Sequence, residues 1–335
     1  MKKLVILSLT ALIAVASCKK DTKSTTTTPP PAPPALKFVF KFDSTQARLG
    51  DSGQVVTLPS THRAQNPHFN GMSAHYIELS KTPTTQVGSG AVLYVTTTQA
   101  SSALTVTNTA GSQTYTNAIV FSEENIVGQG GQFFSIPLSS VPPGTYPYLR
   151  ISVAYQNYDI NYGILQGTAV SGYTLASNYY TTGTIASFIG YNSYINSYKI
   201  KNQTVSVGTN KAQGYWGFES APYVLGGNTY TVAPSQGQAP QGATTVVNPL
   251  FASSAIPAGS CLVTGRFVGP TGARDSLIIT GHETSDIVIT VSMSTNNSFE
   301  WKHNPANPSD NNIYFLNGDT VVNMGVRGMK PILPN

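Results

Sequence analysis

Short runs in which apolar and polar residues alternate recur along most of this chain, and they constrain its fold more than any other feature. The two-residue period runs through residues 38–42, 149–155 and 287–293. Such a period places one set of side chains on one face of a β-strand. Turn sequences such as Pro142-Pro143-Gly144 separate the runs. We therefore expect an all-β fold, built as an antiparallel β-sandwich over residues 36–335.

The middle of the chain departs from this pattern. Residues 155–198 hold nine of the 18 tyrosines and are rich in Asn, Ser and Gly. Residues 184–200 fit a helix by the spacing of their aromatic side chains, and they fit paired strands by their β-branched and aromatic content. Both interpretations stay open, so we expect residues 156–250 to form a Tyr/Asn-rich insertion of unassigned structure.

The N-terminus carries an export signal. Met1-Lys2-Lys3 precedes an apolar run over residues 4–16, and this run is shorter than the roughly 20 residues of a membrane-spanning helix. We expect residues 1–17 to be a signal peptide. The run Val15-Ala16-Ser17-Cys18 resembles the lipobox of bacterial lipoproteins. The resemblance implies acylation of Cys18, with chains such as palmitate, and an anchor in the outer membrane, with the body facing the periplasm or the cell exterior.

Residues 18–35 follow as a tether rich in Thr and Pro, which cannot bury enough apolar surface to fold. The leader and tether hold five of the 19 basic residues but only one of the 14 acidic ones. The body from residue 36 therefore carries a formal charge of only +1, which argues against a nucleic-acid partner. If Cys18 is acylated, Cys261 has no partner for an internal disulfide, and the body must fold by packing.

Histidines near the start of the body suggest a metal site. His62, His68 and His75 fall close together in sequence with Met72. Imidazole and thioether ligands suit copper. We consider His68 and His75 as copper ligands, and the alternative is that they are ordinary strand and loop residues.

The order of the predicted strands adds to this hypothesis. A strand bearing His75, the turn over residues 142–146 and the strand at 287–293 ahead of Trp301 follow one another in the chain. This order resembles MbnP-like copper-binding β-sandwich proteins. The resemblance implies copper held by histidines and a modified tryptophan, without fixing which residues of this chain would serve.

Aspartates and asparagines could supply oxygen ligands to calcium. The candidates are Asp43, Asp159, Asp310 and Asp319, together with the asparagines at positions 311, 312 and 317. Their spacing does not match a calcium-loop motif. We therefore expect them to act as turn formers, with calcium as the alternative.

Four tyrosines of the middle segment form a second candidate site. Tyr179, Tyr180, Tyr191 and Tyr194 lie among asparagines. A tyrosine combines a flat apolar ring with a polar tip, which suits the binding of a glycan or a protein partner. The alternative is that these rings fill the space between sheets.

The chain lacks the common catalytic motifs, including a Gly-x-Ser-x-Gly nucleophile elbow and a phosphate-binding loop. We expect a non-enzymatic, outer-membrane-anchored lipoprotein whose body binds a glycan or a protein partner. An extracytoplasmic copper-binding protein of the same architecture is the alternative. An enzyme of unknown type is a third possibility, because catalytic groups can assemble from distant residues.

Overall fold

A computed structural model describes residues 32–50, 54–108, 111–188, 193–207, 214–238, 262–308 and 312–335. Of residues 101–108 and 111–116 it describes only the backbone. Cys18, Tyr191, Cys261 and Asp310 lie outside these ranges, as do the predicted signal peptide and most of the tether. In the part of the chain that is described, no helix has the length and apolarity required to cross a bilayer.

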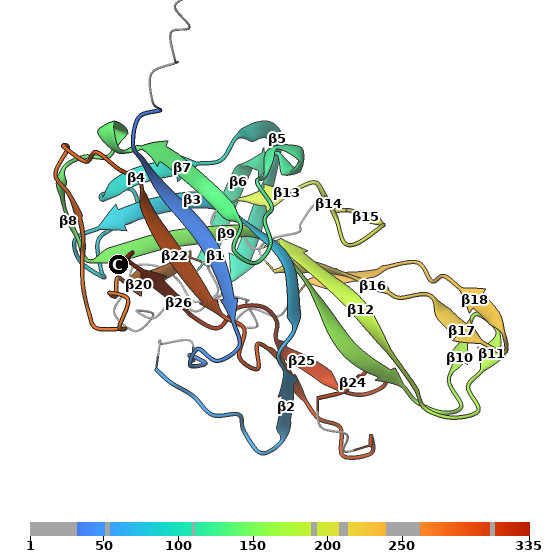
Figure 1. Ribbon diagram of the computed structural model, residues 1–335. Coiled ribbons are helices and arrows are strands. Elements are labelled where there is room, and N and C mark those ends of the chain that lie inside the picture. Colours follow the sequence, from blue (N-terminus) through green and yellow to red (C-terminus); the bar gives the residue numbers. More distant parts are fainter. Residues whose placement is uncertain are drawn as a thin grey trace, which may run out of the picture. The chain divides into compact units, whose positions relative to one another are not determined.

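The prediction of an all-β fold is confirmed, and two sheets form its centre (Figure 1). The smaller sheet contains β1 (Ala35–Asp43), β7 (Gln132–Pro137), β22 (Ile287–Ser294) and β26 (Met329–Ile332), in the order β26-β22-β1-β7. The pair of β1 and β22 is parallel, in contrast to the expected antiparallel arrangement. The two strands are far apart in sequence, so the direction of their pairing depends on the whole path between them and not on local pattern.

The larger sheet has eight strands. They are β3 (His68–Ser80), β4 (Ala91–Val95), β9 (Tyr148–Ile164), β12 (Tyr179–Phe188), β16 (Tyr215–Ser220), β19 (Ser235–Gln238), β20 (Leu262–Arg266) and β24 (Tyr314–Phe315). Six follow the order β19-β16-β12-β9-β3-β4, while β20 and β24 also pair with β9. β9 is therefore the axis of this sheet, because along its 17 residues it pairs with β3, β12, β20 and β24.

The hydrophobic core lies between these two sheets. Phe38 and Phe40 of β1 and Val291 of β22 are fully buried in one cluster with Ile77 of β3 and Ile151 of β9. These are the inward positions of the alternating runs, which explains why the two-residue period predicted a sandwich. Full burial of one such side chain stabilises the fold by about 2 kcal/mol.

A further layer covers the opposite face of the larger sheet. It consists of β5 (Thr98–Asn108), β6 (Gly111–Ile119) and β13 (Tyr194–Ile195), followed by the hairpin of β14 (Ser197–Lys199) and β15 (Thr204–Ser206). Side chains of this layer form one buried cluster with Ala154, Tyr155 and Phe188 of the larger sheet. The described part of residues 184–200 is thus strand and turn, which decides between the two structures that the sequence left open.

Strands from the predicted insertion extend the larger sheet. β12 pairs with β9, and β16 pairs with the other edge of β12. We call residues 160–183 and 220–230 the distal arm. It includes two small hairpins, β10 (Ala169–Val170) with β11 (Tyr173–Thr174) and β17 (Tyr223–Leu225) with β18 (Asn228–Tyr230). The arm has its own buried cluster, made of Tyr162, Ile164, Val170, Leu175, Tyr223 and Leu225.

The remaining described elements are short. They are β2 (His62–Gln65), β8 (Gly144–Tyr146), β21 (Leu277–Ile279), β23 (Phe299–Lys302), β25 (Thr320–Asn323) and the 3₁₀ turns η1 (Phe121–Glu123) and η2 (Leu138–Ser140). β2, β23 and β25 form a three-stranded sheet. β23 and β25 of this small sheet each contribute a side chain to the lining of the pocket described below.

Candidate functional site

The two histidines considered as copper ligands lie on one strand and do not meet. His68 begins β3 and is exposed, whereas His75 lies seven residues further along the same strand and is buried. At about 3.3 Å per residue, the two Cα atoms are separated by roughly 20 Å. Across the described ranges, no three His, Cys, Asp or Glu side chains come close enough together to hold a metal ion.

His75 is a buried polar residue of the larger sheet. Its Nε2 lies 3.0 Å from the hydroxyl of Ser152 and 3.5 Å from that of Ser193. Burial disfavours the charged imidazolium and lowers the pKa of His75 to about 4. His75 is therefore neutral at pH 7, and its contacts are those of a hydrogen-bonded residue within a sheet.

The candidate tyrosines separate into different surroundings. Tyr179 packs edge-on against Tyr223, and Tyr180 packs edge-on against Phe315. Tyr194 belongs to β13 and is buried in the cluster between the further layer and the larger sheet. Tyr191 is outside the described residues. The three described tyrosines therefore do not form a common platform, because Tyr194 fills the space between layers.

The candidate calcium ligands that are described serve as local hydrogen-bond acceptors. Asp43 accepts hydrogen bonds from Lys41 and Thr45, which lower the pKa of its carboxyl group. The buried carboxylate of Asp319 accepts backbone N–H groups of Asn304 and Phe315 at 2.8 and 2.9 Å. These bonds fix turns, as expected from the residue types.

Asp159 is occupied in a similar way. It accepts the hydroxyl of Thr184 at 2.5 Å and the side-chain amide of Asn70 at 3.1 Å, and Lys201 lies 3.7 Å away. These contacts join three separate segments across the larger sheet. The carboxylate thus has protein partners on more than one side.

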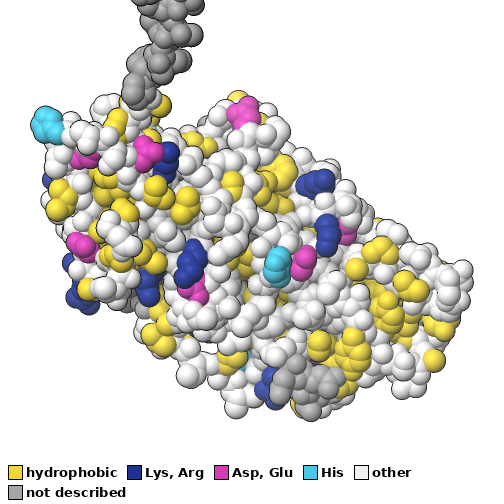
Figure 2. All heavy atoms as spheres, in the orientation of Figure 1, with side chains coloured by type: hydrophobic (Ala, Val, Ile, Leu, Met, Phe, Trp, Pro, Cys, Tyr) yellow, Lys and Arg dark blue, Asp and Glu magenta, His cyan; other side chains and the backbone are white. Residues whose placement is uncertain are grey.

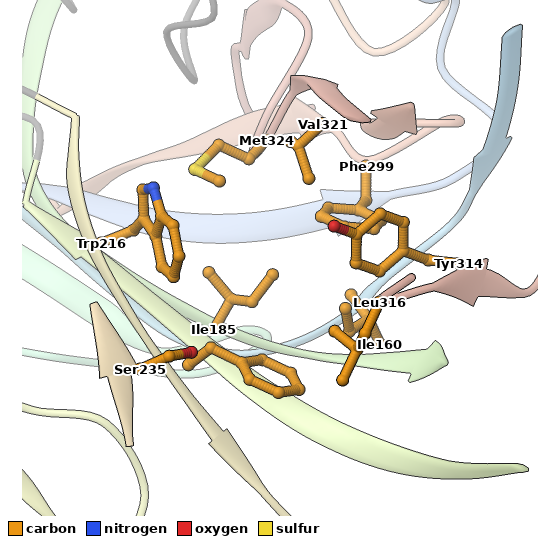
Figure 3. A pocket seen from close by; sticks show the side chains of 10 residues that line it. Ile160, Ile185, Trp216, Ser235, Phe299, Tyr314, Leu316, Val321 and Met324 are labelled. Carbon is orange, nitrogen blue, oxygen red and sulfur yellow. The ribbon is translucent and has the colours of Figure 1, made fainter. Parts of the chain in front are cut away.

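A concave site with apolar walls lies in the described part of the molecule (Figure 3). It lies where the larger sheet meets β23 and β25, and its volume is about 90 Å³. In Figure 3, Trp216 and Tyr314 stand on opposite sides with Ile185 between them. The lining residues are Ile160, Ile185, Trp216, Phe218, Ser235, Phe299, Tyr314, Leu316, Val321 and Met324.

Glycines on neighbouring strands allow the aromatic walls to lie flat. Trp216 of β16 is paired with Gly237 of β19, and a Cβ atom at Gly237 would stand 2.7 Å from the indole. Phe218, two residues along the same face, lies over Gly183 of β12, where a Cβ atom would overlap the ring. An aromatic ring that covers a cross-strand glycine replaces the packing that the glycine lacks. The pocket wall is therefore specified by pairs of residues distant in sequence.

The chemistry of the pocket is apolar and uncharged. None of its ten lining residues is charged, and its polar side-chain groups are the hydroxyls of Ser235 and Tyr314 and the indole N–H of Trp216. Burial, aided by the negative charge of Asp319, raises the pKa of Tyr314 to about 12, so this hydroxyl stays protonated. Leu316 is 41% exposed and forms part of the rim. The site therefore favours an apolar ligand group over an ion.

Charged groups beside the pocket are directed into a network of their own. Glu300, adjacent to Phe299 in β23, forms an ion pair with Arg48 and accepts hydrogen bonds from His62 and Asn323 at 2.6 Å. Burial opposes ionisation of Glu300, but these partners outweigh it and lower the pKa of its carboxyl group. The network ties β2 to β23 and leaves the pocket walls uncharged.

None of the sequence-predicted site residues lines this pocket. The sequence does contain one indication of the pocket, in residues 215–218, Tyr-Trp-Gly-Phe. Trp216 and Phe218 are two positions apart, so they share one face of a strand, and a glycine separates them. Two long segments without any charged residue, 160–198 and 220–265, were a second signal.

Comparison of the chain with protein-family models, with curated proteins and with solved structures finds no match in any of the three.

Proposed function

We propose that this protein is a membrane-anchored binding module that holds a partner polypeptide through one apolar side chain. The anchor is the acylated Cys18 expected from the lipobox, and the binding site is the apolar pocket. The observation that supports this function is the lining of the pocket, in which aromatic and aliphatic side chains surround a volume of about 90 Å³.

The size of the pocket favours an anchor side chain. Pockets for whole drug-sized molecules begin at about 300 Å³, several times the volume found here. Protein interfaces commonly depend on one aromatic or aliphatic residue that fills a small, well-packed pocket. A leucine or phenylalanine side chain of a partner matches both the volume and the polarity.

The polarity of the pocket disfavours a sugar ring as its occupant. A sugar carries a hydroxyl group on most of its carbon atoms, and each one that is buried without a partner costs about 1–3 kcal/mol. Among the lining side chains, three groups could hydrogen-bond to these hydroxyls: those of Ser235 and Tyr314 and the indole N–H of Trp216. A polypeptide side chain has no such requirement.

Fluorine NMR of the protein labelled with 5-fluorotryptophan tests the proposal, because the chain has only two tryptophans. Trp216 lines the pocket, whereas Trp301 is fully buried and does not. We expect N-acetyl-leucinamide to shift the Trp216 resonance and to leave that of Trp301 unchanged. N-acetyl-lysinamide should have no effect. A shift of Trp216 with methyl glucoside and none with the leucine amide would instead identify a glycan site.

A matched pair of variants controls this experiment. Leu316→Asp places a charge on the rim and should weaken binding of the leucine amide at least tenfold. Val224→Asp makes the same kind of change at a position that is 61% exposed and outside the pocket, and it should bind as the unchanged protein does. Equal effects of the two variants would contradict the pocket as the binding site.

The anchor is tested separately. We expect the protein to fractionate with outer membranes and to take up labelled palmitate, and Cys18→Ser to abolish both. An unlabelled protein that nevertheless stays in the membrane fraction would contradict acylation at Cys18.

A further inference from the structure

The outer end of the distal arm is formed by two hairpins that support each other. The turns at Ser171-Gly172 and Gly226-Gly227 have positive φ at both central residues, between 48° and 84°, as tight two-residue hairpin turns require. The ring of Tyr173 lies against Gly226, where an added Cβ atom would be 3.1 Å from Cε2. We call this surface, comprising the two turns with Tyr173 and Val224, the arm tip.

The position of the arm tip is fixed by contacts beneath it. The backbone N–H of Val224 donates a hydrogen bond to the Tyr179 hydroxyl at 3.1 Å, and the Tyr179 ring packs edge-on against Tyr223. Tyr223 is buried in the cluster of the arm. The hairpin turn against which the Tyr173 ring lies is therefore held in place before any ligand arrives, which lowers the entropic cost of binding at the tip.

The arm tip exposes aromatic and neutral polar groups together. Tyr173 is 36% exposed and Val224 61%, and the exposed neighbours Thr174, Asn228 and Thr229 add hydroxyl and amide groups. The distal arm contains no charged residue. In Figure 2, hydrophobic side chains gather on the part of the surface over β10, β11, β17 and β18, while the charged side chains in view lie elsewhere.

We infer that the arm tip binds a neutral polysaccharide, with a sugar ring stacked on Tyr173 and its hydroxyl groups bonded to the surrounding amide and hydroxyl side chains. An aromatic ring offers a flat apolar surface to the C–H face of a sugar. The absence of charge in the arm matches an uncharged polymer and gives no attraction to an acidic one. Neutral hydrogen-bonding groups around the ring suit a hydroxylated ligand better than a lipid tail, which would leave them without partners.

Affinity electrophoresis in gels containing soluble polysaccharides tests this inference. We expect a neutral glucan, mannan or xylan to retard the protein, and alginate, which is acidic, to leave its mobility unchanged. Tyr173→Ala should weaken retardation at least tenfold. Gly226→Ala keeps the tyrosine but displaces its ring, and it should weaken retardation severalfold while the folded structure is retained by circular dichroism.

Tyr180→Ala is the matched control, because Tyr180 is 48% exposed in the same arm and its ring packs on Phe315 of β24. It should alter retardation less than twofold. Equal losses in Tyr173→Ala and Tyr180→Ala would overturn the inference. So would the absence of retardation by every neutral polymer, or binding of the tip to phosphatidylcholine vesicles or to a second copy of the chain in its place. None of these results depends on Leu316 at the rim of the pocket. The arm tip and the pocket are therefore tested independently of each other.

Discussion

The centre of the sandwich and the distal arm belong to the same sheet but are stabilised in different ways. The centre buries aliphatic and phenylalanine side chains between two layers, and it also encloses the ion pair of Glu78 and Arg150, whose side chains have no exposed surface. The arm has a cluster of only six buried side chains, in which the hydroxyls of Tyr162 and Tyr223 lie 2.7 Å apart. The small core of the arm is thus stabilised in part by tyrosine rings whose hydroxyl groups hydrogen-bond to each other.

The two regions also differ in the charge that they bury. A thick core can surround an ion pair with enough hydrogen bonds to offset the loss of hydration. Arg150 also donates hydrogen bonds to the Thr85 carbonyl and the Thr264 hydroxyl, and the backbone N–H of Gly90 donates one to Glu78. The cluster of the arm buries neutral hydroxyl groups in place of an ion pair, and these need fewer hydrogen-bond partners.

The largest expected effect concerns the buried ion pair of the centre. Arg150→Ala leaves Glu78 buried without its charged partner and should reduce the free energy of unfolding by about 3–5 kcal/mol. Arg266→Ala removes an exposed arginine that packs on the half-buried Tyr148 ring and should cost less than about 1 kcal/mol. Urea denaturation measures both. Similar losses in the two variants would remove the proposed difference between a buried and a surface arginine.

A pH dependence should also arise in the centre. The unfolded chain protonates His75 near pH 6.5, whereas the folded protein does so only near pH 4. Between these values the unfolded state binds more protons, so the free energy of unfolding falls as the pH falls. The contribution of His75 should reach roughly 3 kcal/mol by pH 4. In urea titrations across this window, His75→Gln should show a correspondingly smaller slope; an unchanged slope would assign the loss to other groups.

In the arm, packing of an aromatic ring on a glycine should be the sensitive feature. Gly183→Ala places a methyl group in the space that Phe218 occupies and should cost about 1–3 kcal/mol. Because Phe218 lines the pocket, the variant should also weaken binding of the leucine amide. Thr182→Ala, on the exposed neighbouring position of β12, should change neither property. Thermal unfolding and the fluorotryptophan spectrum provide the two measurements.

The smallest effect should come from the tyrosine pair of the arm. Tyr162→Phe leaves the Tyr223 hydroxyl without its partner and should cost about 1 kcal/mol. Tyr223→Phe should cost a similar amount, but the double variant should lose less than the sum, since both polar groups are then gone. Additive losses in this double-mutant cycle would show that the two hydroxyls do not stabilise each other.

The sequence predicted the strand content well because the signal for it is local. The alternation in β1, β9 and β22 is visible without knowledge of the partner strands. The inward positions were correct in β1, in β22 and in β9 as far as Val153, whereas Tyr155, beyond a register shift in the pairing with β3, lies in the cluster on the other face. The parallel pairing of β1 with β22 and the layer that covers Tyr155 and Phe188 depend on contacts between distant segments. No pattern within a single strand carries that information.

The candidate sites were harder to predict for the same reason. His68 and His75 are close in sequence but are held apart by the strand that contains both. Trp216 and Gly237, in contrast, are separated by a turn and a hairpin and lie opposite each other in the sheet. Proximity in sequence is a poor guide to a site in an all-β protein, where side chains meet across strands more often than along them.

The parallel register of β1 and β22 also sets the order in which this protein can fold. Leu36 lies opposite Ile287, so an interior strand at the beginning of the body receives one of its two neighbours from a segment made near the end. Until then β1 can pair only with β7, and one edge of a phenylalanine-rich strand remains open to other chains. Closure of the sandwich over such a sequence separation is slow. A growing chain therefore has to be protected from aggregation until residues 287–294 are available.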